Sequence, residues 1–171
     1  GLDQMGNMFA QREGTDTDAL PVYVGSHLDT QPTGGKYDGV LGVLSGLELL
    51  RTMNDLDIKT KHSIVVTNWT NEEGTRYAPA MLSSGVFAGI HTQDWAYGRV
   101  DAEGKAFGDE LQRVGWRGDE EVGAREMHAF FELHIEQGPI LEAEDKQIGV
   151  VTHGQGLSWT QVTITGKDAH T

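Results

Sequence analysis

A glycine-rich loop carries the first residues whose types and spacing could do chemistry. His27 opens it and Asp38 follows later in the same loop, after a proline and glycines that allow sharp turns back towards the histidine. An imidazole and a carboxylate brought together in this way suit a zinc-like ion. Asp29, two residues after His27, can accept the other ring N–H and fix the tautomer of the histidine.

Two further stretches carry compatible groups. Glu72 and Glu73 are adjacent, so on an extended segment they point to opposite sides, and one can bind metal while the other stays free as a general base. His134 adds a second imidazole. Taken singly, each stretch also has a simpler interpretation: a loop or an acidic turn in water, or a core histidine bonded to the backbone.

Each of these groups lies at or just beyond an apolar stretch typical of a strand. Such stretches occupy residues 20–25, 61–70 and 129–139, and an amphipathic helix is expected over residues 40–50. Strand, helix and strand in this order predict parallel pairing with a right-handed crossover. The carboxyl ends of parallel strands share one edge of a sheet. We therefore expect five side chains to meet there: His27, Asp38, Glu72, Glu73 and His134.

This ligand set suits two divalent ions, with Asp38 able to bridge them. Two ions about 3.5–4 Å apart can share one water, polarise a carbonyl and stabilise an oxyanion. Zinc is the expected metal, and manganese, cobalt and nickel are the alternatives that histidine and carboxylate ligands also accept. The chain has no cysteine, so thiolate ligands and disulfides play no part.

Composition narrows the choice of partners. The 171 residues include 26 acidic and 13 basic side chains, a formal net charge of −13, which argues against nucleic acid or an anionic membrane as a partner. No apolar run approaches the roughly 18 residues that span a bilayer, and the first residues lack signal-peptide character, so we expect the cytoplasm. Because the chain lacks an initiating Met and ends without a helix stop or tail, we expect it to be a piece of a longer polypeptide.

Weaker patterns predict the remaining elements: a strand at residues 5–10, helices at 77–86 and 106–114, and strands at 147–151 and 158–166. We therefore expect an α/β fold with a mostly parallel, partly mixed sheet flanked by helices. Residues 1–155 would form a partial metal-binding catalytic domain. Residues 156–171 would form the first strand of a truncated α+β lid and dimerisation domain.

Three longer motifs connect these residues to a known family. They are GSHLDT followed by GKYDG at residues 25–39, NEEG at 71–74 and ELHIEQGP at 132–139. With them the chain resembles the zinc-dependent amidohydrolases of the aminoacylase and carboxypeptidase superfamily. The similarity is closest to the branch that contains N-carbamoyl-L-amino acid hydrolase, β-ureidopropionase (β-alanine synthase) and allantoate amidohydrolase.

The resemblance implies a role for each metal-site residue. His27 and His134 would each bind one or the other ion, Asp38 would bridge both, and Glu73 would be a further ligand. Asp29 would be the acid that supports the first histidine.

The resemblance also implies the reaction. Glu72 would be the catalytic base, Gln137 would contact the substrate, and His170 would help to hold the oxyanion. The substrate would be a small carbamoyl or ureido compound, cleaved at a linear C–N bond. Relatives add a last histidine ligand and an arginine for the substrate carboxylate outside these residues, and the full-length form would be a homodimer. Alone, this piece should bind metal weakly and hydrolyse little.

Two other interpretations remain open from the sequence. One is a non-catalytic metal-binding or assembly domain with an incomplete site. The other is a related aminoacylase or dipeptidase, which would share the chemistry and differ in substrate.

Overall fold

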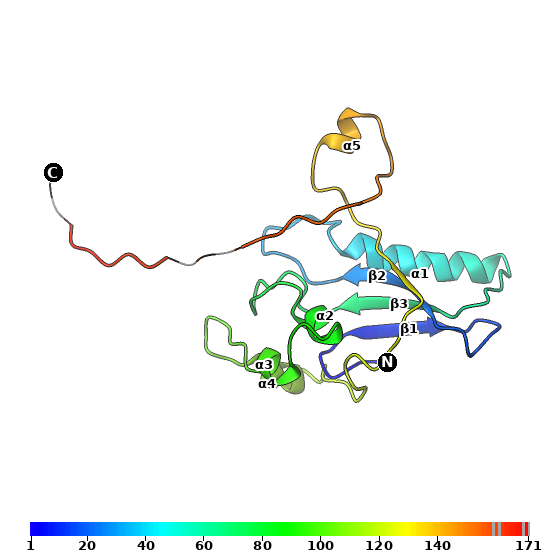
Figure 1. Cartoon of the computed structure of the whole chain (residues 1–171), viewed down its shortest axis with the longest axis horizontal. Helices are drawn as coiled ribbons and strands as arrows, with labels where there is room; N and C mark the ends of the chain where they lie inside the picture. The colour runs from blue at the N-terminus through cyan, green and yellow to red at the C-terminus, as the bar shows by residue number, and fades with distance from the viewer. Residues whose placement is uncertain (159, 161, 169, 171) are drawn as a thin grey trace. The chain divides into compact units, whose positions relative to one another are not determined.

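The computed structural model describes residues 1–158, 160, 162–168 and 170 (Figure 1). The chain divides into two compact units, Gly1–Ile135 and Glu136–Thr171. This division does not test the expected boundary between residues 155 and 156, which stays a prediction. The first unit holds the sheet and the candidate metal-binding residues, His27, Asp38, Glu72, Glu73 and His134.

In the described residues, four strands form one mixed sheet in the order β1-β3-β2-β4. They are β1 (Met8–Arg12), β2 (Val22–His27), β3 (Ile64–Trp69) and β4 (Ala129–Phe131). Strand β2 is parallel to β3, and β1 is antiparallel to β3 at the edge (Figure 1). Strand β2 is also parallel to β4. The expected mixed, mostly parallel sheet with flanking helices is confirmed.

Helix α1 (Val40–Asp55) connects β2 to β3 and packs on one face of the sheet. Its buried residues are Gly42, Val43 and Gly46. A Cβ at Gly46 would lie 3.1 Å from a methyl of Val66, so glycine allows the helix backbone to approach the strands closely. This explains glycines that otherwise cost helix propensity.

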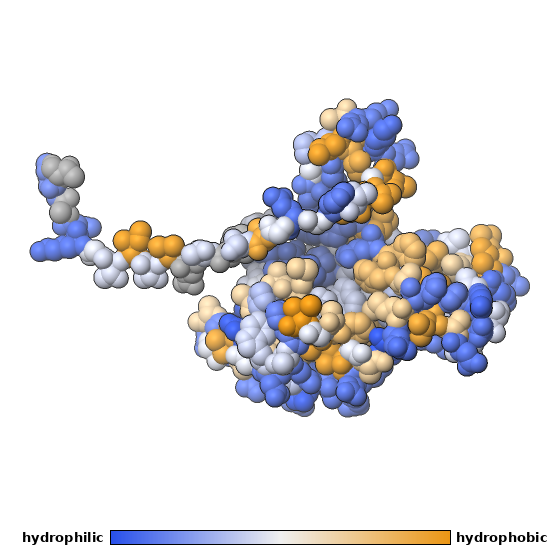
Figure 2. Space-filling view, in the orientation of Figure 1, coloured by the Kyte–Doolittle hydropathy of each residue, from blue (hydrophilic) through white to orange (hydrophobic). Residues whose placement is uncertain are grey.

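The apolar stripe expected on α1 is only partly correct. Leu44 and Leu47 belong to that stripe, yet they are 55% and 43% exposed. The face of the helix that carries Gly42 and Gly46 packs against the sheet, and these leucines flank that contact. Figure 2 accordingly shows apolar patches between hydrophilic residues over the visible face of the first unit.

The opposite face of the sheet is covered by aromatic packing. Phe9, Tyr23, Val65 and Trp69 form a buried cluster, and Phe87 packs against it. The Phe9 ring lies edge-on to the Tyr23 and Trp69 rings, at centroid distances of 6.2 and 6.1 Å. Burial on both faces explains why the sequences of the central strands are almost continuously apolar.

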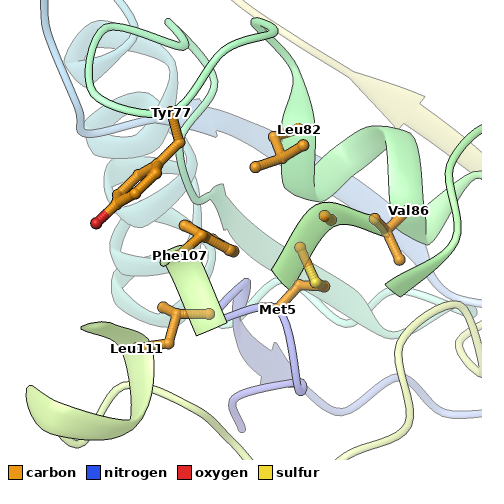
Figure 3. Packing of buried hydrophobic residues seen from close by; sticks show 7 residues of the cluster. Met5, Tyr77, Leu82, Val86, Phe107 and Leu111 are labelled. Atoms are coloured by element: carbon orange, nitrogen blue, oxygen red, sulfur yellow. The ribbon is translucent and has the colours of Figure 1, made fainter. Parts of the chain in front are cut away.

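Three short helices follow β3: α2 (Leu82–Phe87), α3 (Gln93–Tyr97) and α4 (Phe107–Arg113). A second core cluster packs beneath them (Figure 3): Met5, Tyr77, Leu82, Val86, Ala96, Phe107 and Leu111. The helix expected from residue 77 begins only at Leu82, because Met81 adopts a left-handed conformation with φ of 55°. Helix α3 was not expected from the sequence pattern; the Thr92 side chain caps it by accepting the Trp95 N–H.

The second unit contains the helix α5 (Ile140–Ala143). The strand expected at residues 147–151 is absent, and the described members of residues 158–166 form no strand. Trp159 and Gln161 lie outside the described residues. Apolar alternation produces a strand only where a neighbouring strand pairs with it, and none does so in this described part. None of the described helices combines the length and apolar character needed to cross a bilayer.

Candidate metal centre

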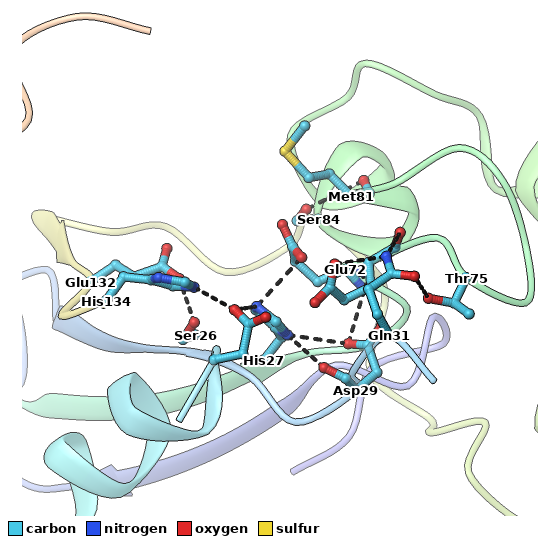
Figure 4. Close-up of polar contacts among 12 residues, drawn as sticks. Ser26, His27, Asp29, Gln31, Glu72, Thr75, Met81, Ser84, Glu132 and His134 are labelled. Carbon is cyan, nitrogen blue, oxygen red and sulfur yellow. Dashed lines mark hydrogen bonds and ion pairs between the residues drawn. The ribbon is translucent and has the colours of Figure 1, made fainter. Parts of the chain in front are cut away.

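Three adjacent strands bring the expected ligands to one edge of the sheet. Strand β2 ends at His27, the turn with Glu72 and Glu73 follows β3, and His134 follows β4. Because β2 lies parallel between β3 and β4, their carboxyl ends meet. Figure 4 shows the His27, Glu72 and His134 side chains converging there. The juxtaposition expected from the sequence is therefore present.

Asp38 faces both histidines. Its Oδ1 atom is 3.2 Å from Nε2 of His134 and 3.9 Å from Nε2 of His27. Asp38 and His27 are buried, with 5% and 3% of their surface exposed. One ligand atom from each of these three residues lies within 4.8 Å of the others, a spacing at which one ion could be held.

A second group overlaps the first at His27. The ligand atoms of His27, Glu72 and Glu73 also lie within 4.8 Å of one another. Nε2 of His27 lies 3.4 Å from Oε2 of Glu72. The two groups share His27, and both the number of ions and the division of roles between the two glutamates stay predictions.

The hydrogen bonds of the two imidazoles leave the correct nitrogen for metal. Nδ1 of His27 is 2.8 Å from the backbone oxygen of Asp29, and Nδ1 of His134 is 2.9 Å from that of Ile135. A carbonyl oxygen only accepts, so each Nδ1 carries a proton and Nε2 faces the carboxylates. A metal ion bound between them would accept the ring lone pairs and the carboxylate oxygens together. The donor set therefore fits a divalent ion.

Asp29 differs in detail from its expected contact with His27. The ring N–H meets the backbone oxygen of Asp29, while the carboxylate Oδ1 lies 3.6 Å from Nδ1. The carboxylate instead accepts the backbone N–H groups of Glu72 at 3.1 Å and Glu73 at 3.0 Å. Asp29 thus orients the histidine through its backbone. Its side chain holds the turn that carries Glu72 and Glu73, which we call the acid turn.

Glu72 occupies a partly buried and strongly acidic environment. Burial raises the pKa of its carboxyl above the ordinary value of 4.5. The His27 imidazole opposes this shift, and the negative charges of Glu73, Asp29 and Glu132 add to it. A carboxyl with a raised pKa binds a proton more readily, which suits a group that accepts and returns one.

Ser26 and Glu132 belong to the site although the sequence patterns did not single them out. The strand expected over residues 129–139 ends at Phe131, and the Ser26 hydroxyl, fully buried, donates to the Glu132 carboxylate just beyond it (Figure 4). This contact ties the segment that carries His134 to the end of β2. The position of Glu132, two residues before the candidate ligand His134, could have indicated that it belongs to the site.

Gln31 and Thr75 were also missed. The Gln31 side chain donates to Oε2 of Glu73 at 3.0 Å and accepts from the Thr75 hydroxyl at 2.8 Å. In an extended segment, residues two apart point to the same side, so Asp29 and Gln31 could have been expected to act together. Without the register between the two loops, nothing identified their partners.

Two expected site residues belong to the second unit. Gln137 has a positive φ of 55°, and His170 lies among the exposed described residues. Their roles in binding substrate and oxyanion stay predictions. The remaining expected residues all lie in the first unit.

Comparison with known proteins places this geometry in a family. The family model described as peptidase family M20/M25/M40 matches residues 15–170. An N-carbamoyl-L-amino-acid amidohydrolase of Rhizobium meliloti is 77% identical over 171 residues, which are 100% of this chain and 41% of that protein. A protein named N-carbamoyl-L-amino acid amidohydrolase from Geobacillus stearothermophilus is 41% identical over 172 residues, 98% of this chain and 42% of that protein.

The fold comparison agrees. The crystal structure of an amidase of the hydantoinase/carbamoylase family from Burkholderia multivorans matches with a TM-score of 0.82 and 58% identity, over 84% of this chain and 35% of that one. The chain spans about two fifths of the length of the curated relatives it matches, 41% and 42%. The resemblance seen in the motifs is confirmed, and the chain belongs to peptidase family M20/M25/M40.

Proposed function

We propose that this chain provides the metal-binding part of an amidohydrolase that cleaves the linear C–N bond of an N-carbamoyl amino acid. The observation that carries the proposal is the pair of imidazole Nε2 atoms facing the buried Asp38 carboxylate, beside the Glu72 and Glu73 pair. The names of the two curated relatives supply the reaction class.

Four side chains would hold two divalent ions, with zinc as the expected metal. They are His27, Asp38, Glu73 and His134. Asp38, which faces both histidines, would serve both ions. When bound, such ions polarise a substrate carbonyl and lower the pKa of a nearby water.

Glu72 would act as the general base. Its carboxylate would take a proton from the water that attacks the carbamoyl carbon and return it to the amino-acid nitrogen as the C–N bond breaks. The products would be the free amino acid and carbamate, which decomposes to ammonia and carbon dioxide. The raised pKa of Glu72 supports this proton exchange.

Other groups would complete the reaction. Gln137 would contact the substrate and His170 would help to hold the oxyanion. The expected assembly is a homodimer.

Metal content and hydrolysis test the proposal together. Plasma mass spectrometry should find about two zinc-like ions in the polypeptide that carries these residues, at the length its gene encodes. That polypeptide should release ammonia and a free amino acid from N-carbamoyl-L-amino acids. A His27→Ala, His134→Ala double variant should lose metal and activity.

Two other outcomes would favour a different function. No stoichiometric metal would leave a non-catalytic domain as the better explanation. Bound metal with hydrolysis of N-acyl amino acids or dipeptides, but not of N-carbamoyl compounds, would identify an aminoacylase or dipeptidase.

A further inference from the structure

The side chain of Gln31 bridges the loop that follows His27 after β2 and the turn that carries Glu72 and Glu73 after β3 (Figure 4). Its Nε2 atom donates to Oε2 of Glu73 at 3.0 Å and approaches the backbone oxygen of Glu73 at 3.4 Å. Its Oε1 atom accepts from the Thr75 hydroxyl at 2.8 Å. Acceptors on one side and a donor on the other determine which way the amide faces.

This contact leaves room for metal on the same carboxylate. An ionised carboxylate has two oxygens and about four lone-pair sites, so a bond from Gln31 to Oε2 leaves Oε1 of Glu73 available. The amide also restricts rotation of a carboxylate whose neighbours, Glu72 and Asp29, carry the same charge. It therefore selects one orientation of Glu73 towards His27.

Asp29 and Gln31 act on different parts of the turn. The Asp29 carboxylate holds the backbone N–H groups of Glu72 and Glu73, and so it fixes the path of the chain. Gln31 holds the Glu73 side chain itself. Thr75, from the far side of the turn, keeps the amide in place.

We propose that Gln31, oriented by Thr75, positions the Glu73 carboxylate for metal binding. Gln31 is a positioning residue, because it acts through Glu73. The inference rests on the proposed function, since it requires that Glu73 binds metal.

Gln31→Glu tests the inference directly. It keeps the shape of the side chain and replaces the N–H donor with an oxygen that repels Glu73. Zinc titration of the metal-free polypeptide, at the length its gene encodes, should show about a 10- to 100-fold weaker affinity at one site, the range typical for loss of a partner of a metal ligand. Hydrolysis at limiting zinc should fall in parallel, and saturating zinc should restore kcat, because in this proposal Gln31 acts only through Glu73.

Thr75 provides the matched pair of variants. Thr75→Val removes the hydroxyl and should weaken zinc binding, but less than Gln31→Glu does. Thr75→Ser keeps the hydroxyl and should match the wild type. Gln112→Glu, the same change on the exposed side of α4, controls for added charge. Circular dichroism would verify folding, and Gln31→Leu removes the donor without adding charge.

The outcomes separate the two proposals. Wild-type zinc affinity in Gln31→Glu and Gln31→Leu, together with loss of zinc in His27→Ala, would overturn the positioning role and leave the metal site intact. An inability of the wild-type protein to bind zinc would overturn both. Equal weakening in Thr75→Val and Thr75→Ser would remove Thr75 from the bridge.

Discussion

Asp29 joins the acid turn through both of its carboxylate oxygens. Oδ1 accepts the backbone N–H of Glu72 at 3.1 Å, and Oδ2 accepts that of Glu73 at 3.0 Å. The backbone oxygen of the same residue receives the His27 ring N–H at 2.8 Å. One residue thus couples the loop after β2 to the turn after β3, and the relative position of imidazole and carboxylates depends on it.

Asp29→Asn should loosen this coupling. The amide keeps the shape but turns an NH₂ group towards one of the two backbone N–H donors, leaving that donor without an acceptor. We expect a loss of about 1–3 kcal/mol in the free energy of unfolding, measured by urea titration, and about a 10- to 100-fold loss in zinc affinity. Asp18→Asn, on an exposed turn, is the control. If both variants behaved alike, the coupling would have no energetic role.

Gly39→Ala should disturb the imidazole directly. A Cβ at Gly39 would overlap the His27 ring, which cannot move away without losing its bond to Asp29. We expect the variant to bind zinc more weakly and to lose about 1–3 kcal/mol of stability, as overpacked sites do. Gly35→Ala, in the same loop, meets nothing within 4 Å and should match the wild type in zinc titrations and thermal melts. Equal zinc binding by the two variants would contradict this role of Gly39.

Glu72→Gln should separate proton transfer from metal binding. The amide cannot take a proton from water, so kcat should fall by about 10²–10⁴-fold with metal content retained. Glu73→Gln should instead lower the metal content, because Glu73 is the proposed ligand. Steady-state hydrolysis and plasma mass spectrometry on both variants would distinguish the roles. Substantial turnover in Glu72→Gln would remove Glu72 from the base role.

The main features of the site could be predicted because strand ends are readable from sequence. Apolar runs predicted β2 and β3, and parallel pairing then required His27 and the Glu72 and Glu73 turn to share an edge. The contacts that hold these groups could not be predicted in the same way. They depend on the register that sets His27 opposite Trp69, and local patterns contain no information about register.

Errors in the secondary structure have a similar origin. Residues 147–151 have strand composition but no neighbouring strand in the described part of the chain, and β4 stops at Phe131 because Glu132 turns to meet Ser26. Both outcomes depend on partners distant in sequence. On α1, close packing at the glycines is present as expected, but Leu44 and Leu47 flank this contact instead of facing the core.

Away from the site, Glu110 should make stability depend on pH. Its hydrogen bonds with Arg113 at 2.7 Å and Arg76 at 2.9 Å lower its pKa from 4.5 to about 2. A carboxyl with a lowered pKa stabilises the folded chain above its unfolded pKa, and this contribution is lost as pH falls from about 4.5 towards 2. Glu110→Gln should therefore be less stable than the wild type near neutral pH, with a difference that shrinks through that window in urea titrations.

Glu48→Gln, which removes a single exposed contact with Arg51 at 3.5 Å, should show a smaller difference. A difference for Glu110→Gln that stayed constant with pH would mean that its ion pairs do not set the acid response.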